Sequence, residues 1–134
     1  MRVALATDHA GLPLKEPVAG WLRDAGHEVV DFGVNEPTPV DYPDVIAPAA
    51  RAVANGECQR AIVLGGSGTG EQIVANKVRG IRCVEAADPV TARLGHQKRF
   101  VGRHQGHQLG VLRRRFECMG AKIRWSQASH PQLT

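Results

Sequence analysis

The chain has 134 residues, of which 43% are hydrophobic and 22% are charged. This length supports one compact domain with a hydrophobic core and is too short for two, and no apolar run approaches the length of a membrane span. Met1 leads directly into a strand-like segment without the pattern of a signal peptide, and Cys58, Cys83 and Cys118 lie far apart without metal-site spacing. These features predict a cytoplasmic protein with reduced thiols, and they argue against a disulfide framework.

Charge is distributed unevenly along the chain. Residues 1–89 contain eight Lys and Arg against twelve Asp and Glu, a balance of −4. Residues 90–134 contain nine Lys and Arg against Glu117 alone, a balance of +8, together with four of the six histidines. A solvated basic tail, an anion-binding arm and a tail of altered sequence are all compatible with this asymmetry.

Hydrophobic patterning predicts alternating strands and helices through the first two thirds of the chain. Short, largely apolar segments predict strands at 3–6, 28–32, 60–64 and 81–84. Helical spacing predicts helices at 14–25, 45–53 and 89–94, and a further helix that contains residues 73–77 and ends near Gly80. The segment 33–43 contains three prolines and is expected to be a loop. This alternation predicts an α/β fold, a Rossmann-like three-layer domain with a parallel sheet. Beyond residue 94 no firm pattern follows, although Val111, Leu112 and Phe116 suit a short helix.

A glycine-rich loop follows the predicted third strand, with four glycines among residues 65–70. Such a loop turns tightly and presents backbone N–H groups at the start of a helix, which suits an anion or a developing oxyanion. It departs from both the phosphate-binding loop of nucleotide hydrolases and the dinucleotide fingerprint. Glu71 behind it suits a general base that takes a proton from carbon. A purely structural turn, with an acidic residue stabilising the first helical turn, remains an alternative.

Asp8 and His9 follow the first predicted strand, and therefore lie at the same sheet edge as the glycine-rich loop. Ligands of open parallel sheets bind beyond the carboxyl ends of the strands, which favours one shared site. Taken separately, Asp8 also suits a helix cap and His9 a partly exposed loop residue.

Ordered motifs across residues 1–94 resemble type B ribose-5-phosphate isomerases and the related galactose-6-phosphate isomerase subunits. The matching segments are DHAGLPLK at 8–15, DFG at 31–33 with DYP at 41–43, GGSGTG at 65–70, and ANK at 75–77 with GIR at 80–82. The resemblance implies a Rossmann-like homodimer or dimer of dimers, with active sites at the subunit interface and with neither metal nor cofactor. It implies interconversion of ribose 5-phosphate and ribulose 5-phosphate through an enediolate, a step of the pentose phosphate pathway in carbohydrate metabolism.

The same resemblance implies roles for individual residues. One branch of the family places a catalytic cysteine at the position of Gly65, whereas GGSGTGEQ at 65–72 is similar to the branch that uses the glutamate. Glu71 is then the base, with Ser67 at the reacting end of the sugar and Asp8 assisting the hydroxyl protons. The implied substrate-binding residues are Asp8, His9, Tyr42, Gly66, Ser67, Gly68, Thr69 and Gly70.

The resemblance ends near residue 94. The family continues with an HNxAN segment that opens the sugar ring and with arginines that bind phosphate, whereas this chain reads GHQKRFV at 95–101. His96 stands slightly before the family position and is the candidate for ring opening, while Arg113–Arg115 suit either a phosphate or a solvated face. We therefore divide the domain into a sugar-phosphate isomerase core at 1–94 and a divergent basic segment at 95–134. A changed reading frame, a replaced tail or a divergent subfamily would each explain the break.

The leading functional interpretation is an aldose–ketose isomerase of a phosphorylated pentose. Isomerisation of a hexose 6-phosphate is the alternative within the same reaction class. A catalytically weak phosphosugar-binding protein is the alternative outside it, because the ring-opening histidine lacks a clear counterpart. We expect neither nucleic-acid nor membrane binding, since Phe100, Phe116 and Trp125 form no base-stacking pattern.

Overall fold

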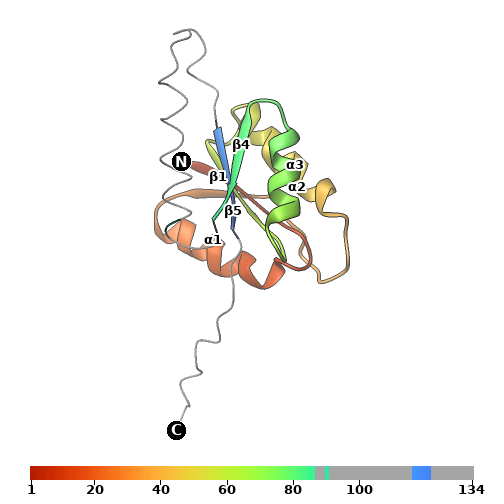
Figure 1. Cartoon of the computed structure of the whole chain (residues 1–134). Helices are drawn as coiled ribbons and strands as arrows, with labels where there is room; N and C mark the ends of the chain where they lie inside the picture. Colours follow the sequence, from red (N-terminus) through yellow and green to blue (C-terminus); the bar gives the residue numbers. More distant parts are fainter. Residues whose placement is uncertain (87–89, 91–115, 122–134) are drawn as a thin grey trace, which may run out of the picture.

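The structure is a computed structural model in which residues 1–86, 90 and 116–121 are described. They form a five-stranded sheet with helices on both of its faces (Figure 1). The elements in chain order are β1 (Arg2–Thr7), η1 (Leu12–Leu14), α1 (Lys15–Asp24), β2 (Glu28–Asp31), α2 (Tyr42–Ala54), β3 (Arg60–Leu64), α3 (Thr69–Lys77), β4 (Ile81–Glu85) and β5 (Phe116–Ala121).

The sheet is parallel throughout, with the strand order β2-β1-β3-β5-β4. From β1 the chain first moves outward to β2, and from β3 it continues on the other side of β1. The strand order therefore reverses between β1 and β3, whose last residues Thr7 and Leu64 are partners in the ladder. A crevice at such a reversal, beyond the carboxyl ends of the strands, is the usual ligand site of an open α/β sheet.

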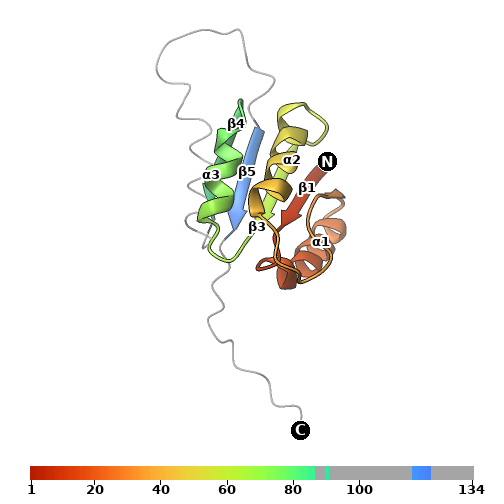
Figure 2. The ribbon, with the colours of Figure 1, turned by 90° about the vertical axis from the view of Figure 1, so that its right-hand side faces the viewer.

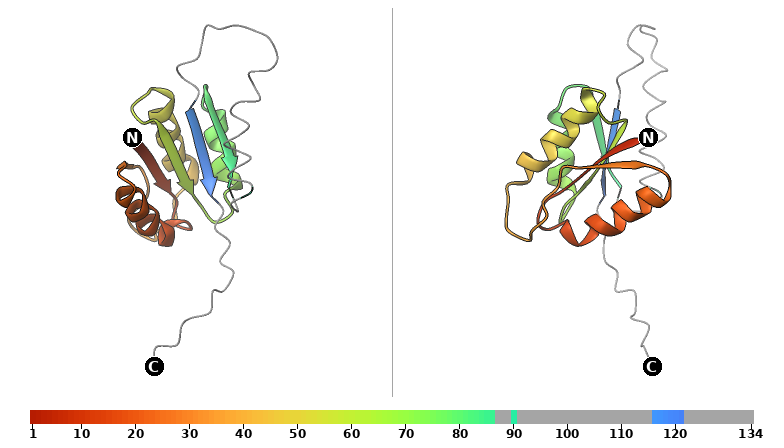
Figure 3. Two further views of the ribbon diagram at one scale, coloured as in Figure 1. Left: turned by 90° about the vertical axis from the view of Figure 1, so that its left-hand side faces the viewer. Right: turned by 180° about the vertical axis from the view of Figure 1, so that it is seen from behind.

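Each face of the sheet packs against its own helices, as the two views in Figure 3 show. Helices α2 and α3 lie together on one face, and α1 lies on the other (Figure 2). Successive side chains of a strand point to opposite faces. Ala4 and Ala6 therefore join the core beneath α2 and α3, while Leu5 joins the smaller cluster beneath α1. The three-layer, Rossmann-like α/β architecture expected from the sequence is confirmed.

Local sequence explains where the helices begin and end. Pro13 lies at the start of η1, where a missing N–H is tolerated, and Pro43 is the second residue of α2. After α1 the chain turns through Gly26 at a φ of 80°, and after α2 through Gly56 at 83°. A residue with a side chain adopts this left-handed conformation only at a cost, so glycine ends both helices.

The expected elements through residue 85 are observed with small shifts at their ends, and the third strand falls on the expected residues 60–64. One expectation is wrong: Phe116 begins strand β5 and does not belong to a helix. β5 is held between β3 and β4, which are distant in sequence, and such pairing leaves no local periodicity to read. Val111, Leu112 and, apart from Val90, the helix expected at 89–94 lie outside the described residues.

Among the described residues, none of the helices has the length and hydropathy needed to cross a membrane.

Candidate active site

The loops that follow β1 and β3 touch one another at the carboxyl edge of the sheet. Gly11 lies so close to the end of β3 that a Cβ added to it would stand 2.7 Å from the carbonyl carbon of Leu64 and would overlap Thr7 Oγ1. A Cβ on Gly66 would contact Ala10 Cβ at 3.3 Å. The two polar clusters predicted from the sequence therefore lie side by side at this edge, as a shared site would require.

Asp8 is buried and takes part in the turn that follows β1. Its Oδ1 accepts a hydrogen bond from the Gly11 N–H at 2.9 Å, and its backbone carbonyl accepts one from Thr7 Oγ1 at 2.9 Å. Asp8 is not the cap considered from the sequence, because the N-cap of η1 is Gly11; the aspartate instead closes the turn that leads to it. His9 is only partly buried, and its Nδ1 accepts the Val40 N–H at 3.4 Å. A neutral ring in this arrangement carries its proton on Nε2, which leaves that nitrogen as a donor for a ligand.

The glycine-rich loop leads into α3 through Gly68, whose φ of 80° is left-handed. The Thr69 N–H donates to Ser67 Oγ at 3.3 Å, and both side chains are exposed at the surface of the loop. The first N–H groups of a helix lack partners within the helix and carry partial positive charge. The loop therefore has the backbone geometry that the sequence predicted for an anion or a developing oxyanion.

Glu71 lies in the first turn of α3 and is only 3% exposed. Its carboxylate is packed against the backbone of Gly65, and its Oε2 has no hydrogen-bond partner. Buried carboxylate oxygens normally accept hydrogen bonds, and leaving one unpaired costs about 1–3 kcal/mol. An unpartnered buried oxygen beside the glycine-rich loop suits a carboxylate that meets a ligand or accepts a proton.

The third wall of the site comes from the loop between β2 and α2. Tyr42, the first residue of α2, lies over the glycine-rich loop so closely that a Cβ on Gly70 would stand 2.9 Å from the ring carbon Cζ. Because Val40 also donates to His9, this loop contacts both halves of the site. Tyr42, which the resemblance implied to bind substrate, therefore borders the glycine-rich loop.

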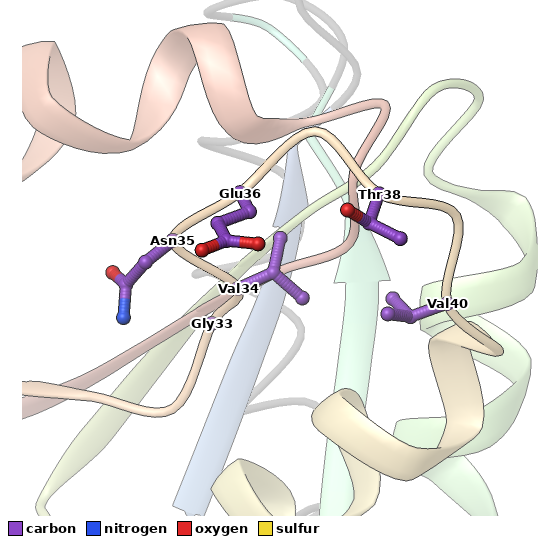
Figure 4. A pocket seen from close by; sticks show the side chains of 6 residues that line it. All are labelled: Gly33, Val34, Asn35, Glu36, Thr38 and Val40. Atoms are coloured by element: carbon purple, nitrogen blue, oxygen red, sulfur yellow. The ribbon is translucent and has the colours of Figure 1, made fainter.

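This loop carries a pocket of its own, which Figure 4 shows from close by. The pocket contains none of the predicted site residues, and it is a depression formed within the loop. The candidate site is formed instead by the polar groups at the strand ends. The residues that line the pocket are Gly33, Val34, Asn35, Glu36, Thr38 and Val40.

Lys15 holds the first half of the same loop in place. Its ammonium donates to the Val34 carbonyl at 2.8 Å and to Asn35 Oδ1 at 2.6 Å, and it lies 2.6 Å from Asp31 Oδ2. The lysine is 5% exposed, so its charge is buried and fully used by these partners. Sequence reasoning gave Lys15 no role. Lys15 lies on the same buried face of α1 as Ala19, and this helical spacing could have indicated that the lysine is buried.

Asn76 fixes α3, and with it Glu71, against the edge strand β4. Its side-chain amide donates to the Cys83 carbonyl at 2.8 Å, and its Oδ1 accepts the Cys83 N–H at 2.8 Å. It also donates to the Gln72 carbonyl at 3.0 Å. The amide thereby takes the place of a neighbouring strand at the edge of the sheet.

The structure brings together all but one of the residues predicted for the site. His96, the candidate for ring opening, lies outside the described residues. Within residues 1–86, 90 and 116–121, no group of three or more His, Cys, Asp and Glu side chains is placed to hold a metal ion. The residues brought together at the carboxyl edge are Asp8, His9, Tyr42, Gly66, Ser67, Gly68, Thr69, Gly70 and Glu71.

Comparison with known proteins gives consistent matches over the same part of the chain. The profile of the Ribose/Galactose Isomerase family matches residues 3–100. Ribose-5-phosphate isomerase B of Mycobacterium tuberculosis is 48% identical over 99 residues, which cover 72% of this chain and 60% of that protein. The corresponding enzyme of Escherichia coli is 38% identical over 96 residues, covering 72% and 64%.

Solved structures extend the match to the fold. Ribose-5-phosphate isomerase B of Clostridium thermocellum is 43% identical, with a TM-score of 0.70 over 72% of this chain and 65% of that one. The enzyme of Thermotoga maritima is 31% identical, with a TM-score of 0.72 over 89% and 73%. The chain spans about three fifths of the length of the curated relatives that it matches. On the family profile, the sequence identity and the shared fold, the chain belongs to the ribose/galactose isomerase family.

Proposed function

We propose that this protein is an aldose–ketose isomerase that interconverts ribose 5-phosphate and ribulose 5-phosphate. The observation that carries the proposal is the carboxylate of Glu71, buried behind the glycine-rich loop with Oε2 unpartnered. A carboxylate oxygen that is not neutralised by a protein donor remains free to accept a proton from carbon. The choice of substrate is supported by the similar proteins, which are named ribose-5-phosphate isomerases B.

In the proposed reaction Glu71 removes the proton from C2 of the open-chain aldose. The electron pair of the broken C–H bond forms the C1=C2 double bond, and the negative charge moves to the oxygen on C1. Backbone N–H groups of the loop, with Ser67 beside them, stabilise this enediolate. Asp8 passes the hydroxyl proton of O2 toward O1, and protonated Glu71 returns its proton to C1, which gives the ketose without any external redox partner.

The remaining residues serve binding. We assign His9, through Nε2, to the phosphate or a hydroxyl of the sugar, and Tyr42 to the wall of the pocket. His96 is retained as the candidate for opening the sugar ring. These assignments agree with the contacts of Asp8, His9 and Tyr42 at the sheet edge.

The test of the proposed reaction is the formation of ribulose 5-phosphate from ribose 5-phosphate by the purified chain and by Glu71→Gln. Removing a general base typically lowers the rate about 10²–10⁴-fold, and we expect kcat to fall in that range with KM changed much less. Glu57→Gln is the matched control, because it makes the same chemical change at an exposed residue near the amino ends of β1 and β3, opposite the candidate site. Activity that survives Glu71→Gln would show that the base lies elsewhere.

A second substrate class is tested in the same assay. A relative from Pectobacterium atrosepticum, 38% identical over 96 residues, is named D-erythrulose-4-phosphate isomerase, so the family is not restricted to pentoses. Erythrulose 4-phosphate and a hexose 6-phosphate should each be compared with ribose 5-phosphate by kcat/KM. Binding of all three without turnover would support the alternative of a phosphosugar-binding protein.

We also propose that the protein acts in the cytoplasm as a homodimer, with residues 1–94 as the isomerase core and 95–134 as part of the same domain. Buried, unpaired Cys58 and Cys83 are consistent with a reducing compartment. Ile73, on the exposed side of α3 close to the glycine-rich loop, is 53% exposed and offers apolar surface for a second copy. Analytical ultracentrifugation of the wild type and of Ile73→Asp tests the dimer, and a monomeric wild type would contradict it.

A further inference from the structure

Gly65, the last residue before the exposed part of the glycine-rich loop, is buried directly beneath the carboxylate of Glu71. A Cβ added to Gly65 would overlap the carboxylate carbon and Oε1 of Glu71 and would stand 2.7 Å from Oε2. All three nearest atoms therefore belong to one carboxylate. The space that a side chain at position 65 would need is the space in which the carboxylate lies.

We propose that Gly65 is a positioning residue, whose lack of a side chain admits the Glu71 carboxylate to its working position. This inference rests on the proposed function, in which Glu71 is the base. Any side chain at position 65 excludes the carboxylate from that place, so the two positions are sterically coupled. The glycine serves to admit the base, and it is not demanded by the conformation of the turn.

The backbone conformation shows whether position 65 needs a glycine for its φ angle or for the space beside Glu71. The described glycines with a left-handed φ are Gly26, Gly56, Gly68 and Gly80, and Gly65 is not among them. An alanine at position 65 is therefore compatible with the backbone, and the obstacle is the far end of a flexible glutamate side chain. Such a side chain moves aside at little cost in folding, which displaces the base while the fold is kept.

The experiment compares kcat and KM for ribose 5-phosphate in Gly65→Ala, in Glu71→Gln and in the double variant. A displacement of the base by about 1 Å costs about 100-fold in rate, and we expect this loss in kcat with KM nearly unchanged. Because Gly65 acts through Glu71, the double variant should be no slower than Glu71→Gln alone. Gly20→Ala is the matched control, since Gly20 lies within α1 and a Cβ there meets no atom within 4 Å.

A shorter carboxylate provides a rescue that a merely structural role of Gly65 would not produce. In the wild-type background Glu71→Asp withdraws the base and lowers kcat. In the Gly65→Ala background the same substitution makes room for the methyl group, and we expect kcat to rise. Gly65→Ala with control-like kcat, or effects of Gly65→Ala and Glu71→Gln that simply multiply, would overturn the proposal.

A crystal structure of Gly65→Ala separates a failure of this inference from a failure of the proposed function. We expect the Glu71 carboxylate to have moved away from residue 65 with the loop backbone unchanged. A carboxylate that keeps its place beside the added methyl would overturn the inference whatever the activity. A wild type without isomerase activity would overturn the proposed function alone, because the displaced carboxylate would still demonstrate the steric coupling.

Discussion

Replacing Lys15 by methionine tests whether one buried ammonium holds the wall of the site. The unbranched apolar side chain fills much the same space as the lysine stem but loses the contacts to Asp31, Val34 and Asn35, at 2.6, 2.8 and 2.6 Å. Breaking a buried charge pair typically costs about 3–5 kcal/mol. The Asp31 side chain is 41% exposed and regains water, so we expect the lower end, about 3 kcal/mol. For a chain of 134 residues this loss lowers Tm by about 10 °C.

The measurement is the free energy of unfolding by urea denaturation, with a thermal melt beside it. Arg23→Met is the matched control on the same helix, because its ion pair with Glu16, at 3.4 Å, is exposed on both sides and should contribute less than about 1 kcal/mol. We also expect Lys15→Met to raise KM at temperatures where the chain is folded, since the loop contacts His9 through Val40. A Lys15→Met protein as stable as Arg23→Met would refute the reasoning, because the ammonium would then contribute nothing beyond its stem.

Three further predictions concern other positions. Asn76→Ala leaves the N–H of Cys83 without its partner and its C=O with only the longer bond from Gln72 Nε2 at 3.4 Å, and should lower the free energy of unfolding by about 1–3 kcal/mol in urea. Gly70→Ala forces the Tyr42 ring away from the loop, and should raise KM about fivefold, or about 1 kcal/mol, in the isomerase assay. Burial raises the pKa of the Cys58 thiol, so alkylation by iodoacetamide should require a higher pH than for a free cysteine, as read by mass spectrometry of its peptide.

Each of these has its own control. Exposed Lys77→Ala, next to Asn76, should leave the free energy of unfolding within about 0.5 kcal/mol of the wild type. A Gly70→Ala enzyme with unchanged KM would remove Tyr42 from the substrate pocket. Cys58 should react at neutral pH once the chain is unfolded in urea, and equally rapid reaction in the folded state would contradict its burial.

Most strands and helices could be predicted from the sequence because their hydrophobic patterns are local. After Arg60 the run at 61–64 is apolar and is followed by Gly65, so the strand was predicted at its observed bounds, 60–64. Strand β5, in contrast, was not predicted from the sequence. Phe116–Ala121 forms a strand by pairing with β3 and β4, and the prediction of a short helix that includes Phe116 was wrong. Pairing with distant segments is absent from any local window of sequence.

The candidate site shows the same division. The sequence by itself determined its ingredients: a carboxylate and a histidine after one strand, and a glycine-rich loop with Glu71 after another. It could do so because parallel strands bring their carboxyl ends to one edge. Only the tertiary structure decided that Gly65 gives its space to the Glu71 carboxylate, and that buried Lys15 fixes the loop beside His9. These are contacts between side chains of different elements, and such contacts exist only after the chain has packed.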